Sequence, residues 1–137
     1  MTNTSTSEGR AARIVASVLG TILAAGGASK LLGEPHQVAH FAAWGLPHWF
    51  LLLVGTFEII GGALLVVPQT TPLGSLILGT IMVGALWTHV SHAEWPDTLP
   101  VLVVLAMLTF VFRRSQARVI RLLGGVGAPL AAQAGSR

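Results

Sequence analysis

The residue with the clearest chemical potential is Glu58, a carboxylic acid in the middle of an apolar segment. An ionised acid at the centre of a membrane-spanning helix costs roughly 2.5–3.5 kcal/mol even on lenient insertion scales. Its helical face is otherwise bare, because glycines lie three residues before it and three and four residues after it (Gly55, Gly61 and Gly62), and this allows another helix to approach closely. Glu58 is therefore either a proton-handling or ligand-binding group, or a hydrogen-bonding contact between helices.

Lys30 and His89 are the groups that could act together with Glu58. Lys30 is the only lysine. It could form a surface ion pair with Glu34, worth less than about 1 kcal/mol, or turn inward toward Glu58 or an anionic ligand. His89 could donate a hydrogen bond or transfer a proton. Glu58 and His89 are thus the candidate acid and base of any catalytic reaction.

Histidine pairs at helical spacing raise the question of a metal ion. His36 and His40 are four residues apart, and His89 and His92 are three apart, so either pair could share one ion. No His-Glu-x-x-His or Glu-x-x-His sequence accompanies them. We therefore expect no resident metal and keep these four histidines as the candidates if one binds. The absence of cysteine excludes disulfide shuttling, thiolate metal sites and iron–sulfur clusters.

Composition and charge distribution indicate an integral membrane protein. Charged residues make up 9% of the chain, against about a quarter in soluble domains, and the mean hydropathy is +0.73. All the arginines lie before residue 14 or after residue 112. By the positive-inside rule, this predicts a multi-pass membrane protein with both termini in the cytoplasm. We expect the membrane to be the bacterial cytoplasmic (inner) membrane. It also explains the isoelectric point near 11.2 without nucleic-acid binding.

Four apolar segments approach the roughly 20 helical residues that a bilayer requires. They are residues 14–32, 49–67, 73–90 and 97–112. Pro68 and Pro72 frame a tight turn between the second and third segments, because proline interrupts a continuing helix. Small residues on the third segment (Ser75, Gly79, Thr80 and Gly84) are expected to pack against other helices of the bundle. Trp44, Trp49 and Trp95 are expected in an aromatic belt at the outer interface.

Two further helices are expected at the membrane surface. His36 and His40 lie among apolar residues and predict a short outer interfacial helix that ends near Gly45. After the last span, Arg114, Arg118 and Arg121 share one face of a predicted amphipathic helix. The fold class is therefore all-α, an antiparallel bundle of four transmembrane helices. Its expected parts are a cytoplasmic tail (1–12), the membrane domain (13–112), the amphipathic helix (113–123) and a disordered tail (124–137).

Three motifs occur in a characteristic order between residues 40 and 89. They are His-Phe-Ala-Ala-Trp-Gly-Leu-Pro at 40–47, Gly-x-x-Glu-x-x-Gly-Gly at 55–62 and Ala-Leu-Trp-Thr-His at 85–89, with Lys30 before them and Pro100 and Arg113-Arg114 after them. In this order they resemble the DoxX-like family of small four-helix membrane proteins. The resemblance implies a link to membrane oxidoreductase complexes, since the family takes its name from a subunit of a thiosulfate:quinone oxidoreductase. Lys30, Glu58 and His89 match its recurring polar positions, whereas His36, His48 and His92 do not.

Three functions are consistent with these observations. The first is an accessory subunit that binds a quinone, lipid or isoprenoid in an outward-facing pocket lined by Lys30, His40 and Trp87. Its partners would be the bilayer, a soluble redox protein and other copies of the chain. The second is a stand-alone isomerase or epoxide-opening hydrolase that uses Glu58 and His89. Their depths differ by about 10 Å at 1.5 Å per residue, so a tilted helix or an intervening substrate would have to join them. The third is a structural protein without a ligand.

Overall fold

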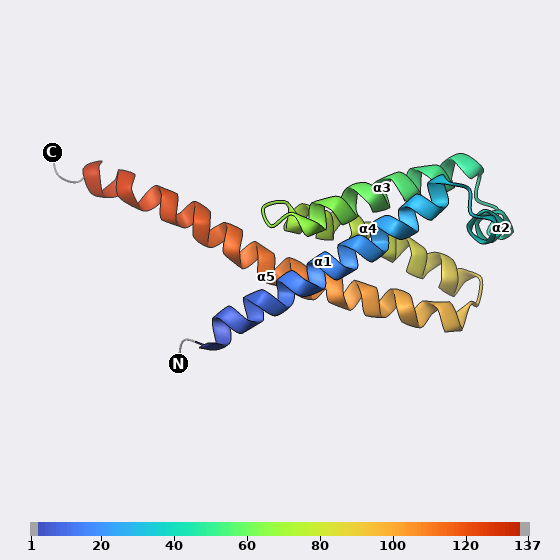
Figure 1. The fold of residues 1–137 in the computed structure, drawn as a ribbon, viewed down its shortest axis with the longest axis horizontal. Helices are drawn as coiled ribbons and strands as arrows, with labels where there is room; N and C mark the ends of the chain where they lie inside the picture. Colours follow the sequence, from blue (N-terminus) through green and yellow to red (C-terminus); the bar gives the residue numbers. More distant parts are fainter. Residues whose placement is uncertain (1–2, 135–137) are drawn as a thin grey trace.

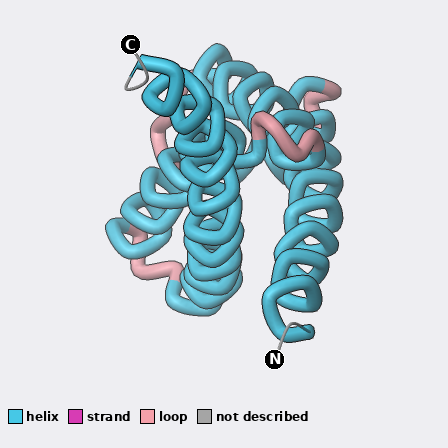
Figure 2. The backbone as a smooth tube through the Cα atoms, turned by 90° about the vertical axis from the view of Figure 1, so that its left-hand side faces the viewer, coloured by secondary structure: helices cyan, strands magenta, loops and turns pink. Residues whose placement is uncertain are grey.

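The computed structural model describes the backbone of residues 3–134 and most side chains between residues 7 and 120. Within this range, helices are joined by short loops (Figure 2). The helices are α1 (Asn3–Leu31), α2 (Pro35–Ala43), α3 (His48–Val66), α4 (Thr71–Ser91) and α5 (Trp95–Ala134). The stretches long and apolar enough to cross a membrane are Gly9–Leu31, His48–Val66, Thr71–Ser91 and Trp95–Ala117. The predicted all-α membrane bundle is confirmed.

The last helix differs most from the sequence-based expectation. Its candidate span reaches Ala117, whereas the apolar pattern suggested an end at residue 112. No glycine or proline occurs between residues 101 and 123, so α5 continues through Arg113 and Arg114. It extends to Ala134, past three glycines and a proline between residues 124 and 129. The boundaries expected at residues 113 and 124 are therefore not helix ends, and residues 124–134 are helical where composition suggested disorder. The side chains of Arg118 and Arg121 lie outside those that the structure describes.

The long helices alternate in direction along the bundle (Figure 1). α1 runs toward α2, α3 returns, α4 runs back toward α2, and α5 returns and extends beyond the bundle. α1 packs mainly on α3, α3 on α4 and α4 on α5, and α1 also contacts α5. We call the half of the bundle with the α3–α4 turn the terminal half, because both chain termini extend from it. The half with α2 and the α4–α5 turn is the α2 half.

The hydrophobic core lies in the terminal half. It contains buried side chains from all four long helices: Ala16, Leu19, Leu65, Leu78, Met82, Leu108 and Val111. The turn between α3 and α4 is fastened there by threonine hydroxyls. Thr70 donates to the carbonyl oxygen of Leu64 at 2.8 Å, and Thr71 donates to that of Val67 at 2.8 Å. These bonds satisfy carbonyls that the end of α3 leaves without intrahelical partners.

Glycines bring the helix backbones into direct contact. A Cβ atom on Gly62 of α3 would lie 2.5 Å from the carbonyl oxygen of Gly20 on α1, and one on Gly74 of α4 would lie 2.6 Å from the amide nitrogen of Leu65. Side chains at these positions would separate the helices. Gly79 and Gly84 behave differently, because an added Cβ would meet none of the described atoms within 4 Å. The expectation that these two glycines pack helices together is wrong.

Candidate binding site in the alpha2 half

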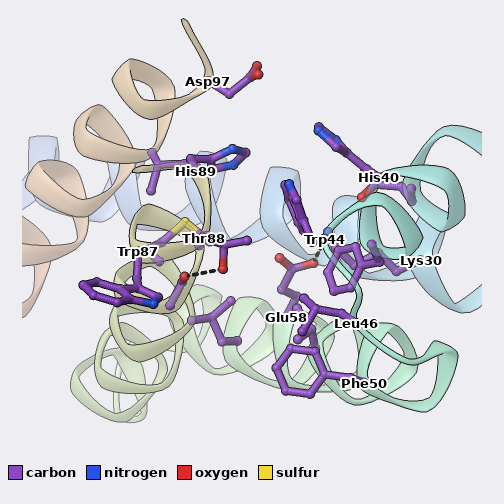
Figure 3. A pocket seen from close by; sticks show the side chains of 18 of the residues that line it. Lys30, His40, Trp44, Leu46, Phe50, Glu58, Trp87, Thr88, His89 and Asp97 are labelled. Carbon is purple, nitrogen blue, oxygen red and sulfur yellow. Dashed lines mark hydrogen bonds and ion pairs between the residues drawn. The ribbon is translucent and has the colours of Figure 1, made fainter. Parts of the chain in front are cut away.

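A cavity of about 730 Å³ lies in the α2 half, between α2, α3 and α4 (Figure 3). Gly74 holds α4 against α3 in the terminal half. Farther along, the α4 residues that line the cavity include the small residues Thr80, Gly84 and Ala85, and space opens between the helices. Phe50, Leu53 and Phe57 of α3 form an apolar wall. Small residues of α4 opposite large apolar residues of α3 therefore contribute to this space.

A buried ion pair lies at the α1–α3 side of this cavity. The Lys30 Nζ atom is 2.8 Å from the Glu58 Oε2 atom, and the two side chains are only 12% and 7% exposed. Both residues line the cavity. Of the two arrangements open to Lys30, the structure has the inward one. Each charge balances the other where an isolated charge would be costly.

Glu34, the alternative partner of Lys30, instead caps α2. Its carboxylate accepts hydrogen bonds from the backbone amides of His36 at 3.1 Å and Gln37 at 3.0 Å. Because both bonds favour the ionised form, they hold the pKa of Glu34 below its usual value. Together with Pro35 at the first helical position, this cap explains why the predicted helix around His36 and His40 begins where it does.

A second polar cluster centres on Glu94, in the turn between α4 and α5. Its Oε2 atom lies 2.8 Å from Nδ1 of His89, and its Oε1 atom accepts from Nε1 of Trp44 at 3.1 Å and lies 3.3 Å from Nε2 of His40. A carboxylate only accepts, so these contacts place protons on Nδ1 of His89 and Nε2 of His40. The cluster ties α2 to the far end of α4.

The environment of Glu94 favours its ionised form. Desolvation opposes ionisation, but the hydrogen bonds from His89, Trp44 and His40 together outweigh it and lower the pKa of Glu94. The His40 ring stacks on Trp44 at 4.5 Å between centroids. The rings of Trp44 and His89 are nearly perpendicular, with their centroids 5.1 Å apart. Glu94 is therefore a partly exposed carboxylate that accepts hydrogen bonds from three aromatic side chains.

An unusual turn brings Glu94 back to His89. After α4, the amide of Ala93 donates to the carbonyl of Val90 and the amide of Glu94 to that of His89, with Ala93 in the left-handed region at φ 57°. This is the Schellman pattern. The ends of α1 and α2 show the same pattern, but with Gly33 (φ 69°) and Gly45 (φ 71°) at the left-handed position. Ala93 thus takes a conformation that glycine adopts at lower cost.

The structure gathers most of the sequence-predicted residues around the cavity. Its lining includes Lys30, His36, His40, Glu58, Trp87 and His89. Trp87 is 74% exposed and its ring points away from the other labelled side chains (Figure 3), so it forms a rim rather than an inner wall. His92 is exposed, and its Nδ1 atom lies 2.9 Å from the carbonyl oxygen of Thr88. Its expected pairing with His89 is absent from the described contacts.

Glu58 and His89 belong to different clusters. Glu58 pairs with Lys30 at 2.8 Å, whereas His89 pairs with Glu94 at 2.8 Å. Both side chains nevertheless line the same cavity. A molecule in the cavity could therefore contact both residues.

Sequence reasoning missed Trp44, Glu94 and Asp97. Trp44 was assigned to the interfacial belt together with Trp49 and Trp95. Those two are 63% and 65% exposed, but Trp44 donates to Glu94. The available signal was an acid five residues after His89. It went unnoticed because a return turn is expected at glycine, and alanine stands at residue 93.

Four apolar helices with a cavity between them define a small multi-pass membrane protein of the helical-bundle class. The chain belongs to the DoxX-like family, whose model matches residues 14–111. The matched segment includes every residue of both polar clusters. No curated protein and no solved structure matched the chain.

Proposed function

We propose that the protein binds an apolar small molecule with a polar head group in the cavity of the α2 half. The observation that carries this proposal is a large, mainly apolar cavity with a few convergent polar side chains, which is the usual composition of small-molecule sites. Its volume of about 730 Å³ lies within the range of roughly 300–1,000 Å³ seen for such pockets.

The two polar clusters favour a quinone as the ligand class. A quinone head group has two carbonyl oxygens on opposite sides of a ring, and both accept hydrogen bonds. Lys30 can donate from the α1 side, because Glu58 takes only one of its ammonium protons. On the other side of the cavity, His40 and His89 each direct one ring N–H to Glu94, so each would donate to the ligand through its second ring nitrogen in the doubly protonated form. The apolar tail would lie between α3 and α4, where Leu53 and Phe57 are 43% and 44% exposed. A lipid could use the same donors, whereas an isoprenoid hydrocarbon could not.

The physiological role that fits such a ligand is an accessory subunit of a membrane oxidoreductase system. The family resemblance supports this role, because its founding name refers to a quinone-reducing enzyme. The role implies a soluble redox partner, and we include association between copies of the chain in the proposal. The terminal half would face the cytoplasm of a bacterial inner membrane, since Arg10, Arg13, Arg113 and Arg114 all lie toward it.

A stand-alone enzyme is the second candidate. It is supported by the presence of Glu58 and His89 in one cavity, but their separate partners mean that a substrate would have to lie between them. Such an enzyme would convert an apolar substrate in detergent without a partner. An accessory subunit would bind its ligand and leave it unchanged.

Native mass spectrometry of the full chain, released from lipid nanodiscs, tests the proposed function. The matched variants are Gly84→Leu, which fills the cavity, and Gly79→Leu, which adds the same side chain on α4 outside the cavity lining. We expect a stoichiometric quinone or lipid on the wild type and on Gly79→Leu, and its loss from Gly84→Leu. Equal occupancy of both variants, or a ligand-free wild type, would contradict the proposal.

A further inference from the structure

His89, Glu94 of the α4–α5 turn and Asp97 in the first turn of α5 form a cluster whose two acids are not among the donors of the small-molecule site. One ligand atom each from His89, Glu94 and Asp97 lies within 4.8 Å of the other two. Sequence spacing had directed attention to histidine pairs, but these acids complete the set instead. We propose that the three residues bind a divalent first-row transition metal, represented by Zn²⁺.

The donor types determine the class of ion. An imidazole nitrogen favours Zn²⁺ and its transition-metal neighbours, whereas Mg²⁺ and Ca²⁺ favour all-oxygen sites. Three protein ligands with one open position are the usual arrangement of a catalytic zinc site. Ligand atoms about 2.0–2.2 Å from a tetrahedral ion are about 3.3 Å apart, so atoms now up to 4.8 Å apart would move closer together. If His89 binds through Nδ1, its contact with Glu94 lengthens from 2.8 Å and the proton on Nδ1 is released to solvent as the ion binds. Two carboxylates also balance the charge of a divalent ion.

The residues around the cluster support its ligands from α2. Trp44 and His40 both contact the Oε1 atom of Glu94, at 3.1 and 3.3 Å. This fixes the carboxylate while its Oε2 atom faces His89. Outer-shell hydrogen bonds of this kind orient metal ligands and strengthen binding. The turn at Ala93, which has a positive φ, also orients the ligands, because it holds Glu94 beside His89.

The cluster adjoins the proposed binding cavity without depending on it. His89 and Asp97 both line the cavity (Figure 3), so a metal between them would border that space with its open coordination position available to an oxygen atom. There it would act as a Lewis acid toward a head group or a water molecule. Metal binding itself needs only the three side chains, and it holds whether or not a small-molecule ligand exists.

Zn²⁺ titration of the detergent-purified full chain tests this site, with isothermal calorimetry and elemental analysis as readouts. The chain carries an affinity tag without histidine, and Mg²⁺ serves as the comparison ion. We expect one Zn²⁺ per chain and no saturable Mg²⁺ binding. Glu94→Gln and Asp97→Asn should each weaken Zn²⁺ binding by at least about 10-fold, and Trp44→Phe by about 10-fold through loss of an outer-shell bond.

His92→Ala is the matched control, because His92 is the neighbouring histidine outside the cluster. It should bind Zn²⁺ like the wild type. Asp97 is exposed, so Asp97→Asn is expected to fold and remains informative if the Glu94 variant does not. No saturable Zn²⁺ binding by the wild type would overturn the proposal. So would unchanged binding by Asp97→Asn, or loss of binding in His92→Ala.

Discussion

Helices α3 and α4 are in contact in the terminal half and are separated by a cavity in the α2 half, although both halves contain small residues. In the terminal half, Gly61 and Gly74 bring the helices into contact, and an added Cβ at Gly74 would lie 2.7 Å from the Gly61 carbonyl oxygen. In the α2 half, Gly84 leaves space and lines the cavity. The same residue type therefore closes one half of the pair and opens the other.

The difference lies in what faces each glycine. Gly74 faces backbone atoms of α3, whereas Gly84 shares a cavity with Phe50 and Leu53, which are large. Large side chains on one helix hold the other away, and small residues opposite them then border empty space. The hydrophobic core lies in the closed half, whereas the cavity with its polar side chains lies in the open half.

The largest expected effect comes from breaking the Lys30–Glu58 ion pair beside the cavity of the α2 half. Lys30→Met leaves the buried Glu58 carboxylate without its counterion. We expect a loss of about 3–5 kcal/mol in unfolding free energy, measured by thermal or denaturant unfolding in detergent. The double variant Lys30→Met/Glu58→Leu should recover most of that loss, because two apolar side chains leave no unpaired charge. If Lys30→Met alone is as stable as the wild type, the ion pair does not contribute to the unfolding free energy.

Gly62→Ala and Gly79→Ala should have opposite effects on stability, because Gly62 contacts a neighbouring helix and Gly79 contacts none among the described residues. The Cβ of Gly62→Ala would lie 2.5 Å from the carbonyl oxygen of Gly20, and we expect a destabilisation of about 1–3 kcal/mol by overpacking. Gly79→Ala adds the same methyl group in open space and should stabilise the chain by about 0.5–1 kcal/mol through helix propensity. Both values come from the same unfolding assay. Equal effects of the two variants would mean that the contact between α1 and α3 is not tight.

Ala93→Gly should stabilise the α2 half by about 1 kcal/mol, since glycine adopts the left-handed conformation at residue 93 without the Cβ clash. The reverse changes at the matching turns, Gly33→Ala and Gly45→Ala, should destabilise by a similar amount. Differential scanning calorimetry of the three variants measures these shifts. If Ala93→Gly lowers the melting temperature, the turn does not have the described conformation.

The smallest effect expected is the pH dependence of the α2 cap. Hydrogen bonds lower the pKa of Glu34 from 4.5, so the stabilisation by the cap is complete above pH 4.5 and is lost as the pH falls through the lower folded-state value. Hydrogen exchange at the amides of His36 and Gln37 should accelerate there, after correction for intrinsic rates. Glu34→Gln should remove this pH dependence. If the pH-dependent acceleration of exchange persists in Glu34→Gln, another titratable group causes it.

Much of the fold was predictable from the sequence. Apolar length identified the four spans, and Pro68 and Pro72 located the turn between α3 and α4. The extent of α5 was not predictable, because charge at Arg113 and Arg114 suggested an end that backbone propensity does not impose. The pattern of small residues on α4 could not show which glycines pack, since that depends on the side chains of the facing helix.

The sequence was sufficient to identify most of the polar residues of the site, but it could not show which side chains they contact. Glu58, Lys30 and His89 were recognisable because polar groups are rare in apolar segments. Their pairing could not be derived, since Lys30 had two acids within reach and His89 meets Glu94 only through a turn with an alanine in the left-handed region. Trp44 looked like an interfacial residue because its hydrogen-bond acceptor is 50 residues away in the sequence.

The central claim, that α3 and α4 are closed in the terminal half and open in the α2 half, has a direct test in single-cysteine labelling. The native chain contains no cysteine. Ala85→Cys places a thiol in the cavity lining, and Ser75→Cys places one at a buried position on the same helix. In lipid vesicles, N-ethylmaleimide should label residue 85 at least about 10-fold faster than residue 75, because thiol reactivity follows access and ionisation. Adding Gly84→Leu should abolish the difference. Equal labelling rates in the two single variants would contradict the account.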